Sequence, residues 1–518
     1  MLPIIPLSVK WSKSEGSFTF SSGVKILVTN QFGDLAEYVN EWISNILGFK
    51  LEQINSKTSQ NIIEFKLDPS LERLGEEGYR LDIASNIISI QGNTPHGLFY
   101  GVQSFLQLVF SVRESNEIKL PLILIEDFPR FKWRGFMLDV SRHFQSVETI
   151  KKLLQVMALL KMNRFHWHFN DDQGWRIEIP EYPFLTEIGS KRKDSQIGGF
   201  LSRKYRGESH QGFYTQEDVR EIIQFAQKRY IQVIPELELP GHCSAVIASY
   251  PELSCRSKKV EVKTKSGIFK DVYCPGKENT FTFIEDILNK LIELFPSDTI
   301  HIGGDETPKG RWKECIDCQS RIKNENLMNE EGLYDYFINR IVAFLKSRGK
   351  KCIGWNQILS PSLDKSVIVQ WWMGQKRNLI KSLKQGRKIV SSSMSHSYLD
   401  YNYLLFPLHR FYNYEPIPKN LEREYHNNLL GLEAVLWTEW VPNLERLGWQ
   451  AFPRLIASAE AGWTQRNLKD YKNFEQRVPM IFKFLKILKI QHAEMKEVEP
   501  SFLKRFLQFY KWFKWPKI

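Results

Sequence analysis

Residues 299–306 read Thr-Ile-His-Ile-Gly-Gly-Asp-Glu, an apolar run that ends in two glycines and two adjacent carboxylates. The run over residues 299–303 predicts a short buried strand. The glycines allow the backbone to bend beyond that strand and leave room for a substrate. In barrels of parallel strands, catalytic side chains lie at the carboxyl ends of the strands. We therefore predict that Asp305 and Glu306 lie at the rim of such a barrel.

The same pattern, a short apolar run followed by polar residues, recurs on both sides of this stretch. Amphipathic segments with apolar residues at helical spacing separate the runs, at residues 147–160, 216–229, 281–294 and 333–347. The eight predicted strands are residues 135–140, 164–169, 232–237, 299–303, 351–355, 367–371, 388–392 and 430–436. Eight alternating units favour an α/β fold, a (β/α)8 TIM barrel, over an open doubly wound sheet. We assign this barrel to residues 128–490.

The chain before the barrel has a different order of predicted strands and helices. It alternates β-rich and helical runs, which predicts a small α+β domain over residues 1–127. The β-rich runs are residues 24–29, 61–67, 79–83 and 87–91, and the helical runs are 34–47 and 97–109. The boundary falls at Asp127-Phe-Pro-Arg130, because proline ends the strand predicted at residues 120–125.

Residues 491–518 form a third segment, a basic and aromatic helical extension in which residues 502–515 interleave Phe, Tyr and Trp with Lys and Arg. A helix of this kind can lie on a membrane surface. We favour the alternative, that its aromatic face docks on the protein itself, and we expect no membrane contact.

Polar and aromatic side chains gather at the ends of seven of the eight predicted strands. One such residue is most often a helix cap or a solvated loop residue, but seven strand ends are hard to obtain from capping. The segments are residues 139–143, 170–172, 236–242, 303–306, 355–357, 370–372 and 437–439. They hold acids, histidines, an arginine and tryptophans, without a Gly-x-Ser-x-Gly elbow, a dinucleotide fingerprint or a Walker loop.

Acids together with indole rings suit the cleavage of a glycosidic bond. One carboxylic acid protonates the departing oxygen, negative charge supports the oxocarbenium-like state, and aromatic walls hold the sugar. A divalent metal is the rival explanation for clustered acids, and the intervening aromatics weaken it. Adjacent strand residues point to opposite sides, so Asp305 and Glu306 cannot face each other as acid and nucleophile. We therefore expect different roles for them.

The composition limits the other classes of function. Hydrophobic residues at 42% and charged residues at 25% are ordinary for a globular protein. The net charge of +12 is spread along the chain without a reader motif, so we expect no nucleic-acid partner. The first residues lack a basic region and are broken by Pro3 and Pro6, which makes a poor signal peptide. We expect either a cytoplasmic protein or a periplasmic or secreted one whose signal has been removed.

The six cysteines leave two states open. Cys315 and Cys318 form a Cys-x-x-Cys pair, but no second pair and no histidine pair follows at zinc spacing. We therefore expect no metal site and no cofactor. Cys255 and Cys274 flank a lysine-rich segment and could close it by a disulfide in an oxidising compartment. Six free thiols are the alternative.

Four motifs resemble glycoside hydrolase family 20 β-N-acetylhexosaminidases. They are residues 136–144 (Phe-Met-Leu-Asp-Val-Ser-Arg-His-Phe), 166–176 (His-Trp-His-Phe-Asn-Asp-Asp-Gln-Gly-Trp-Arg), 235–242 (Pro-Glu-Leu-Glu-Leu-Pro-Gly-His) and 301–306. Residues 78–81 and 96–104 also resemble the small domain of that family, so the likeness covers about residues 15–490.

The resemblance implies an exo-acting, retaining hydrolase of terminal β-linked GlcNAc or GalNAc. In that family the substrate's own 2-acetamido oxygen attacks the anomeric carbon and forms an oxazolinium intermediate. Glu306 would be general acid and then base, Asp305 would orient the acetamido N–H, and Tyr398 would donate to the acetamido oxygen. Asp171 and His242 would tune the acid. The resemblance also implies Arg142, Asp400 and Glu439 as ligands of sugar hydroxyls, and Trp355, Trp372 and Trp437 as pocket walls.

Two positions depart from the family pattern. Asn356-Gln357 stands where many members have Asp-Glu, so we expect an acidic contact to be lost, and Glu238 replaces a common Asp. The tryptophans could instead be core residues. The alternatives are a lacto-N-biosidase-like or modified-sugar hydrolase of the same family and a non-catalytic carbohydrate-binding barrel. The expected partner is a glycan, and a homodimer is compatible with this reading.

Overall fold

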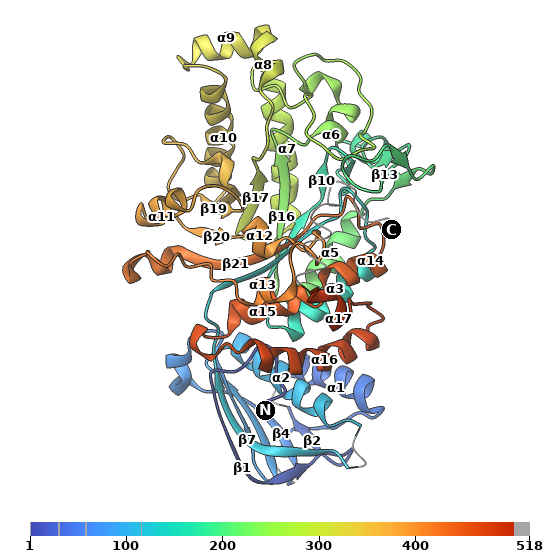
Figure 1. Cartoon of the computed structure of the whole chain (residues 1–518), viewed down its shortest axis with the longest axis vertical. Coiled ribbons are helices and arrows are strands. Elements are labelled where there is room, and N and C mark those ends of the chain that lie inside the picture. Colours follow the sequence, from blue (N-terminus) through green and yellow to red (C-terminus); the bar gives the residue numbers. More distant parts are fainter. Residues whose placement is uncertain (1, 29–31, 57–59, 115–116, 502–518) are drawn as a thin grey trace.

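The computed structural model describes residues 2–28, 32–56, 60–114 and 117–501, and it has two parts. A sheet with helices on one face forms the N-terminal part, and a closed barrel with helices around it forms the rest (Figure 1). The predicted fold class, a TIM barrel preceded by a small α+β domain, is confirmed.

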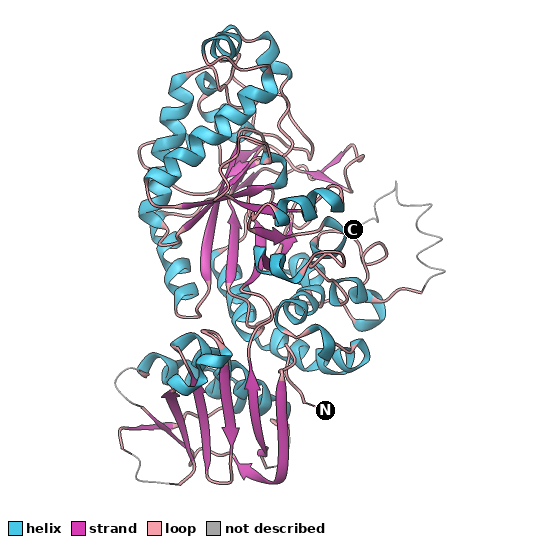
Figure 2. Ribbon diagram, turned by 90° about the vertical axis from the view of Figure 1, so that its left-hand side faces the viewer, coloured by secondary structure: helices cyan, strands magenta, loops and turns pink. Residues whose placement is uncertain are grey.

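The N-terminal domain is a seven-stranded mixed sheet in the order β1-β7-β5-β6-β4-β2-β3. Helices α1 (Gly33–Leu47) and α2 (Pro95–Ser111) lie between this sheet and the barrel (Figure 2). Residues 97–110 of α2 are all buried, as expected for a helix that is covered on every side. The strands are β1 (Lys10–Thr19), β2 (Lys25–Leu27), β3 (Glu52–Ile54), β4 (Ile62–Leu67), β5 (Tyr79–Ile83), β6 (Ile87–Gly92) and β7 (Lys119–Asp127).

Two strands of this sheet, β1 and β3, escaped prediction from the sequence. Both are edge strands, and β1 is exposed along nearly its whole length. An edge strand with polar residues on both faces shows no alternation of apolar and polar positions, and charged side chains there discourage pairing with other chains.

The barrel closes in the order β16-β17-β18-β19-β20-β21-β8-β9, and every neighbouring pair of strands is parallel. All eight predicted strands are present, most with ends shifted by one or two residues. Their bounds are β8 (Trp133–Asp139), β9 (Arg164–His168), β16 (Gln232–Leu239), β17 (Thr299–Gly303), β18 (Lys351–Trp355), β19 (Ile368–Trp371), β20 (Ile389–Ser391) and β21 (Leu429–Leu436).

The barrel helices begin at side-chain caps that the sequence supplies. Ser146 accepts a hydrogen bond from the backbone N–H of Thr149, and Thr215 forms a capping box with Asp218. The main barrel helices are α3 (Val147–Leu159), α5 (Gln216–Gln227), α7 (Glu278–Leu294), α10 (Glu330–Ser347), α11 (Lys376–Lys384) and α15 (Arg454–Trp463).

Short elements fill the connections of the barrel. The helices are α4 (Phe184–Glu187), α6 (Ser244–Ser249), α8 (Gly310–Glu314), α9 (Ile316–Asn324), α12 (Met394–Ser397), α13 (Leu408–Tyr412) and α14 (Leu444–Ala451). The short strands are β10 (Asn170–Asp171), β11 (Gly174–Trp175), β12 (Lys191–Arg192), β13 (Gln196–Ile197), β14 (Lys204–Tyr205) and β15 (His210–Gln211). The 3₁₀ turns of the barrel are η2 (Pro251–Leu253), η3 (Asn356–Ile358), η4 (Arg423–Asn428) and η5 (Arg466–Leu468), whereas η1 (Pro69–Leu74) lies in the N-terminal domain between β4 and β5.

Helix α16 (Tyr471–Ile487) joins the two parts (Figure 1). Its Phe484 stacks on Phe110 of α2 with ring centroids 3.7 Å apart. Its Arg477 forms a buried ion pair with Glu460 of α15 at 2.5 Å and donates to the carbonyl of Ile4. Because α16 contacts both parts through buried groups, the small domain and the barrel share one interface.

The start of the C-terminal extension lies against the barrel. Helix α17 (Met495–Val498) is followed by Glu499, which accepts hydrogen bonds from the backbone N–H of His409 and the hydroxyl of Tyr471. The basic aromatic residues 502–518 lie outside the described residues. Among the helices of the described residues, none combines the length and the apolar character needed to cross a membrane.

A buried cation–anion pair lies where the two parts meet. Asp127, at the end of β7, accepts hydrogen bonds from Lys161 Nζ at 3.1 Å, Tyr79 Oη at 2.7 Å and Trp463 Nε1 at 3.0 Å. The side chains of Lys161 and Asp127 are fully buried. A buried charge of this kind is tolerated only while its counter-charge is present.

The change Asp127→Asn tests this pair. It keeps the shape of the side chain but leaves Lys161 buried without an anion, so we expect the free energy of unfolding to fall by about 3–5 kcal/mol. Urea unfolding followed by tryptophan fluorescence measures the change. The control is Glu422→Gln in the exposed Lys384–Glu422 pair, whose loss should leave the unfolding midpoint unchanged. Equal midpoints for both variants would contradict the assignment.

Candidate active site

The site is built on a turn that only glycine permits. Gly303 and Gly304 have φ values of +63° and +98°, in the left-handed region. A Cβ on Gly303 would lie 2.0 Å from Glu238 Oε1, and one on Gly304 would lie 2.2 Å from Ile358 Cγ2. The amide of Gly304 donates to Glu238 Oε1 at 3.0 Å. The turn is therefore fixed by Glu238, one of the residues that depart from the family pattern.

The two carboxylates beyond this turn lie in different surroundings. Asp305 is only 8% exposed, and its Oδ1 has no hydrogen-bond partner among the described residues. Burial raises the pKa of Asp305 to about 6, and the charges of Glu236 and Glu306 add to that shift against the opposing effect of His242. The side chain of Glu306 is 37% exposed, and its backbone has a φ of +43°. Their carboxylate oxygens come within 4.8 Å of each other, so the two residues differ in burial rather than in position.

His242 connects Glu306 to two aspartates. Its Nε2 lies 3.7 Å from Glu306 Oε2, while its Nδ1 lies 3.2 Å from Asp172 Oδ2 and 3.4 Å from Asp171 Oδ1. Burial disfavours the imidazolium, but the aspartates outweigh burial and raise the pKa of His242. Asp172 also accepts from Ser244 through the backbone N–H and the hydroxyl. The structure thus brings Asp171 and His242 together as predicted and adds Asp172.

Arg142 lies on the other side of Asp171. The guanidinium is 2.5 Å from Asp171 Oδ2 and 3.4 Å from Asp139 Oδ2, and its Nε donates to Gln173 Oε1 at 3.0 Å. Asp139 also accepts from the backbone N–H and hydroxyl of Thr438, which links the ends of β8 and β21. Arg142 is therefore held from several strand ends at once.

Two further acids lie in this part of the site, namely Asp400 and Glu439. Burial raises the pKa of both, and the charge of Glu439 raises that of Asp400 further, whereas Arg142 opposes the shift at Glu439. Asp400 Oδ1 has no hydrogen-bond partner within the described part of the chain. Buried carboxyl oxygens without partners are suited to accept from hydroxyl groups of a ligand.

The aromatic residues form one cluster. Tyr398 packs with Trp355, while Trp372 and Trp437 pack against it, and the ring of Trp372 lies parallel to that of Tyr398 at 6.1 Å. Trp355 is buried and donates to Glu236 Oε1 at 2.8 Å, so it forms the floor of the cluster. Trp372 and Trp437 are partly exposed. The tryptophans thus include both a core residue and candidate pocket walls.

The departure at Asn356-Gln357 has a structural role. Asn356 Oδ1 accepts from the backbone N–H of Trp372 at 2.9 Å, and Gln357 Oε1 accepts from Trp372 Nε1 at 2.7 Å. The amide oxygens of Asn356 and Gln357 thus hold Trp372 by accepting hydrogen bonds that carboxylate oxygens could also accept. The expected loss of an acidic contact does not leave the indole without a partner.

Residues inside the barrel support the site from below. Glu236 lies 2.8 Å from His301 Nδ1 and 3.1 Å from His166 Nε2, and it hydrogen-bonds to His168 Nδ1. His168 Nε2 lies 3.1 Å from Asp171 Oδ2, which continues the network to Arg142. Sequence reasoning assigned these residues no role. The sequence pattern that could have indicated them is the alternation of polar residues at 166 and 168 and at 236 and 238. This spacing places the polar side chains on one face of each strand.

Groups of His, Cys, Asp and Glu atoms that could hold a metal ion occur in two places in the described chain. Most belong to the network and site above, where hydrogen bonds join His168 to Glu236 and His242 to Asp172. The other group is four cysteines, Cys255, Cys274, Cys315 and Cys318, which lie outside the site. None of the six cysteines, all within the described ranges, forms a disulfide.

Comparison with known proteins agrees with this geometry. The family model for the glycosyl hydrolase family 20 catalytic domain matches residues 131–466, and that for domain 2 of the family matches residues 1–128. A beta-hexosaminidase of Porphyromonas gingivalis is 40% identical over 495 residues, which cover 92% of this chain and 62% of that protein. A beta-hexosaminidase of Vibrio furnissii is 31% identical, covering 89% of this chain and 76% of that protein. This chain thus spans less than two thirds of the Porphyromonas protein.

Solved structures show the same arrangement. The exo beta-N-acetylglucosaminidase of Vibrio harveyi, in complex with N-acetylglucosamine, has a TM-score of 0.85 at 30% identity and covers 95% of this chain and 78% of that chain. A beta-N-acetylhexosaminidase of Bacteroides fragilis has a TM-score of 0.80 at 29% identity, covering 96% of this chain and 99% of that one. The chain belongs to glycosyl hydrolase family 20.

Proposed function

We propose that the protein is a retaining exo-β-N-acetylhexosaminidase, which removes terminal β-linked GlcNAc or GalNAc from the non-reducing end of a glycan. The observation that carries this proposal is the buried Asp305 with an unpartnered Oδ1, within the described residues, beside the more exposed Glu306. Asp305 and Glu306 are adjacent in the chain, and we assign them different roles because their burial differs. The β-hexosaminidase relatives support the same activity.

In the proposed reaction the substrate supplies the nucleophile. Asp305 accepts the acetamido N–H and offsets the positive charge that develops on that group, while Tyr398 donates to the acetamido oxygen. Burial and the charge of Asp305 raise the pKa of Tyr398, which keeps the hydroxyl protonated. An aligned intramolecular nucleophile has an effective molarity of about 10⁵ to 10⁸ M. Positioning the acetamido group is therefore the main task of these two residues.

Glu306 moves the proton in both steps. As an acid it protonates the glycosidic oxygen while the bond from C1 to that oxygen breaks and the acetamido oxygen bonds to C1. As a base it then takes a proton from the water that attacks C1 and opens the oxazolinium ion. Two inversions at C1 give retention. His242, held by Asp171 and Asp172, lies beside Glu306 and supports its change of charge.

The remaining polar residues select a terminal sugar. Arg142, Asp400 and Glu439 offer a cation and two acids to adjacent sugar hydroxyls, and Trp372 and Trp437 offer aromatic faces to the ring. The sequence is compatible with a homodimer, and the molar mass in solution would test that state.

The first prediction concerns the proton carrier. We expect Glu306→Gln to lower kcat by about 10² to 10⁴ on a GlcNAc disaccharide, because the sugar leaving group needs a proton. The loss should be smaller on a nitrophenyl β-GlcNAc glycoside, whose leaving group departs unprotonated. Glu422→Gln serves as the control and should keep full activity. Equal losses on the two substrates would argue against Glu306 as the acid.

The second prediction concerns pH. Asp305 must be ionised to offset the acetamido charge, and its pKa is about 6. Its carboxylate is therefore lost as the pH falls, and kcat/KM should decline by about tenfold per pH unit below that pKa. Profiles from acidic to neutral pH with the nitrophenyl glycoside measure this limb. In Asp305→Asn the rate should be low and the limb absent, whereas a limb that persists in the variant would assign it to another group.

The third prediction separates the assisted mechanism and the alternatives. We expect hydrolysis of aryl GlcNAc and GalNAc glycosides and competitive inhibition by a thiazoline that mimics the oxazolinium ion. Cleavage of aryl disaccharide glycosides alone would indicate a lacto-N-biosidase-like enzyme. Binding of GlcNAc without turnover of any of these substrates would indicate a carbohydrate-binding barrel.

A further inference from the structure

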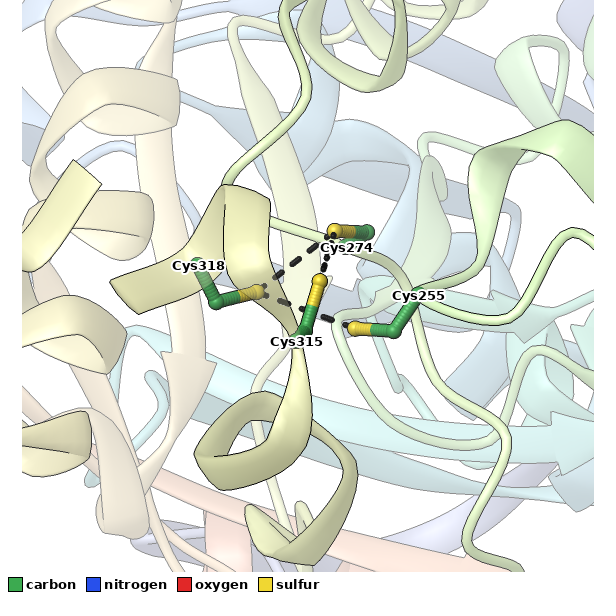
Figure 3. A group of neighbouring side chains, drawn as sticks. All are labelled: Cys255, Cys274, Cys315 and Cys318. Atoms are coloured by element: carbon green, nitrogen blue, oxygen red, sulfur yellow. Dashed lines mark hydrogen bonds between the residues drawn. The ribbon is translucent and has the colours of Figure 1, made fainter. Parts of the chain in front are cut away.

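Four cysteines from two separate loops meet outside the active site (Figure 3). Cys255 follows η2, and Cys274 precedes α7. Cys315 lies between α8 and α9, and Cys318 lies in the first turn of α9. Their four Sγ atoms all lie within 4.8 Å of one another. No second cysteine pair stands at zinc spacing in the chain, but the fold brings Cys255 and Cys274 to Cys315 and Cys318 from about 40 to 60 residues away.

The distances fit a tetrahedral metal site. The Sγ atom of Cys274 lies 3.5 Å from that of Cys318 and 3.7 Å from that of Cys315, and Cys255 Sγ lies 3.7 Å from Cys318 Sγ. Four sulfurs at about 2.3 Å from a zinc ion lie about 3.8 Å from one another. A disulfide would bring two sulfurs to about 2.05 Å. Cys274 and Cys318 each approach two other sulfurs, which suits a shared ion better than pairs.

Backbone groups around the sulfurs provide the second layer of such a site. The amide of Gly276 hydrogen-bonds to Cys274. A Cβ on Gly276 would lie 2.3 Å from the backbone N of Cys318, so only glycine allows the two loops to approach this closely. Amide donors to thiolates orient the ligands and spread their charge.

The surroundings allow a cation to enter and offset the charge of four thiolates. Three of the cysteines are buried, and Cys255 is partly exposed. A cavity of about 320 Å³ opens at Cys255 and Cys315, and Arg256, Arg311 and Glu314 line it. A zinc ion with four thiolates carries a net charge of −2, which the two guanidinium groups offset in part, because Arg311 also lies 3.4 Å from Asp271.

We propose that Cys255, Cys274, Cys315 and Cys318 bind one Zn²⁺ ion as a closed structural site. Tetrahedral sulfur ligands select zinc or iron among the common metals, and a site with four protein ligands leaves no position open for chemistry. The ion clips the loop that follows β16 to the segment that follows β17. Those two strands lead to His242 and Glu306.

The clipped loop also contacts the active site. The amide of Lys263 donates to the carbonyl of Asp172 at 3.0 Å, and the carbonyl of Lys265 accepts from Gln173 Nε2 at 2.9 Å. Gln173 in turn accepts from Arg142 Nε. Loss of the ion should therefore loosen the loop and raise KM more than it lowers kcat. This consequence rests on the proposed function, whereas metal binding does not.

The experiment measures zinc in the full chain purified under reducing conditions without chelator. Elemental analysis should find one zinc per chain, and a mercurial thiol reagent should release it to a colorimetric zinc indicator. In Cys315→Ser and Cys318→Ser the zinc content should fall to about a tenth or less, because each variant removes one of the four thiolate ligands. Cys352→Ser is the matched control, since Cys352 lies buried in β18 away from the cluster.

Metal-free wild type, prepared by denaturation with chelator and refolding, covers the case in which the variants do not fold. Added Zn²⁺ should raise its melting temperature and protect four thiols from a disulfide reagent. Four thiols that stay reactive after zinc is added would overturn the site. A mass lower by four hydrogens, from two disulfides, or iron in place of zinc would overturn it as well. Zinc at one equivalent with an unchanged KM in the zinc-free protein would overturn only the link to the active site.

Discussion

The carboxylate of Glu236, buried in the barrel, is the group on which the site depends. Three histidines and the indole of Trp355 surround it, and they come from strands β9, β17 and β18. Burial alone would raise the pKa of Glu236, but the histidines outweigh burial and lower it. In return the acids raise the pKa of His166 to about 9 and that of His168 to about 10. The barrel interior therefore holds charges of both signs in fixed positions.

This buried charge divides the acids of the site into two groups. Asp171 faces Arg142 and His242, which overcome its burial and lower its pKa. Asp305 shares His242 as its cation, but the charges of Glu236 and Glu306 oppose that effect, so its pKa is raised. Only one of the two aspartates is thus fully compensated by the protein. The uncompensated one is suited to a substrate group that gains positive charge during the reaction.

The sequence predicted the eight strands and the residues at their ends because both depend on local pattern. Strand 299–303 is a short apolar run, and Asp305 follows it. Contacts between residues of different strands leave no local pattern in the sequence. For this reason the contact of Asp172 with His242 was not predicted, and Glu236 was given no role. The same reason applies to the cysteines, since Cys274 and Cys318 are 44 residues apart and meet only in the fold.

Two features of the fold hold the ends of strands β16 and β17. One is the buried charge network of Glu236, and the other is the set of loops that follow these strands. The network of Glu236 fixes the strands from inside the barrel, and through Asp171, Arg142 and Gln173 it meets the loops beyond the strands at Lys265. Those loops lack a regular sheet of their own, so their backbone must be held by other contacts. The four cysteines bring together the loops after β16 and β17, and none of them belongs to the His, Asp and Glu groups of the site. Rigid loops and tuned carboxylates can therefore be supplied by separate parts of the fold.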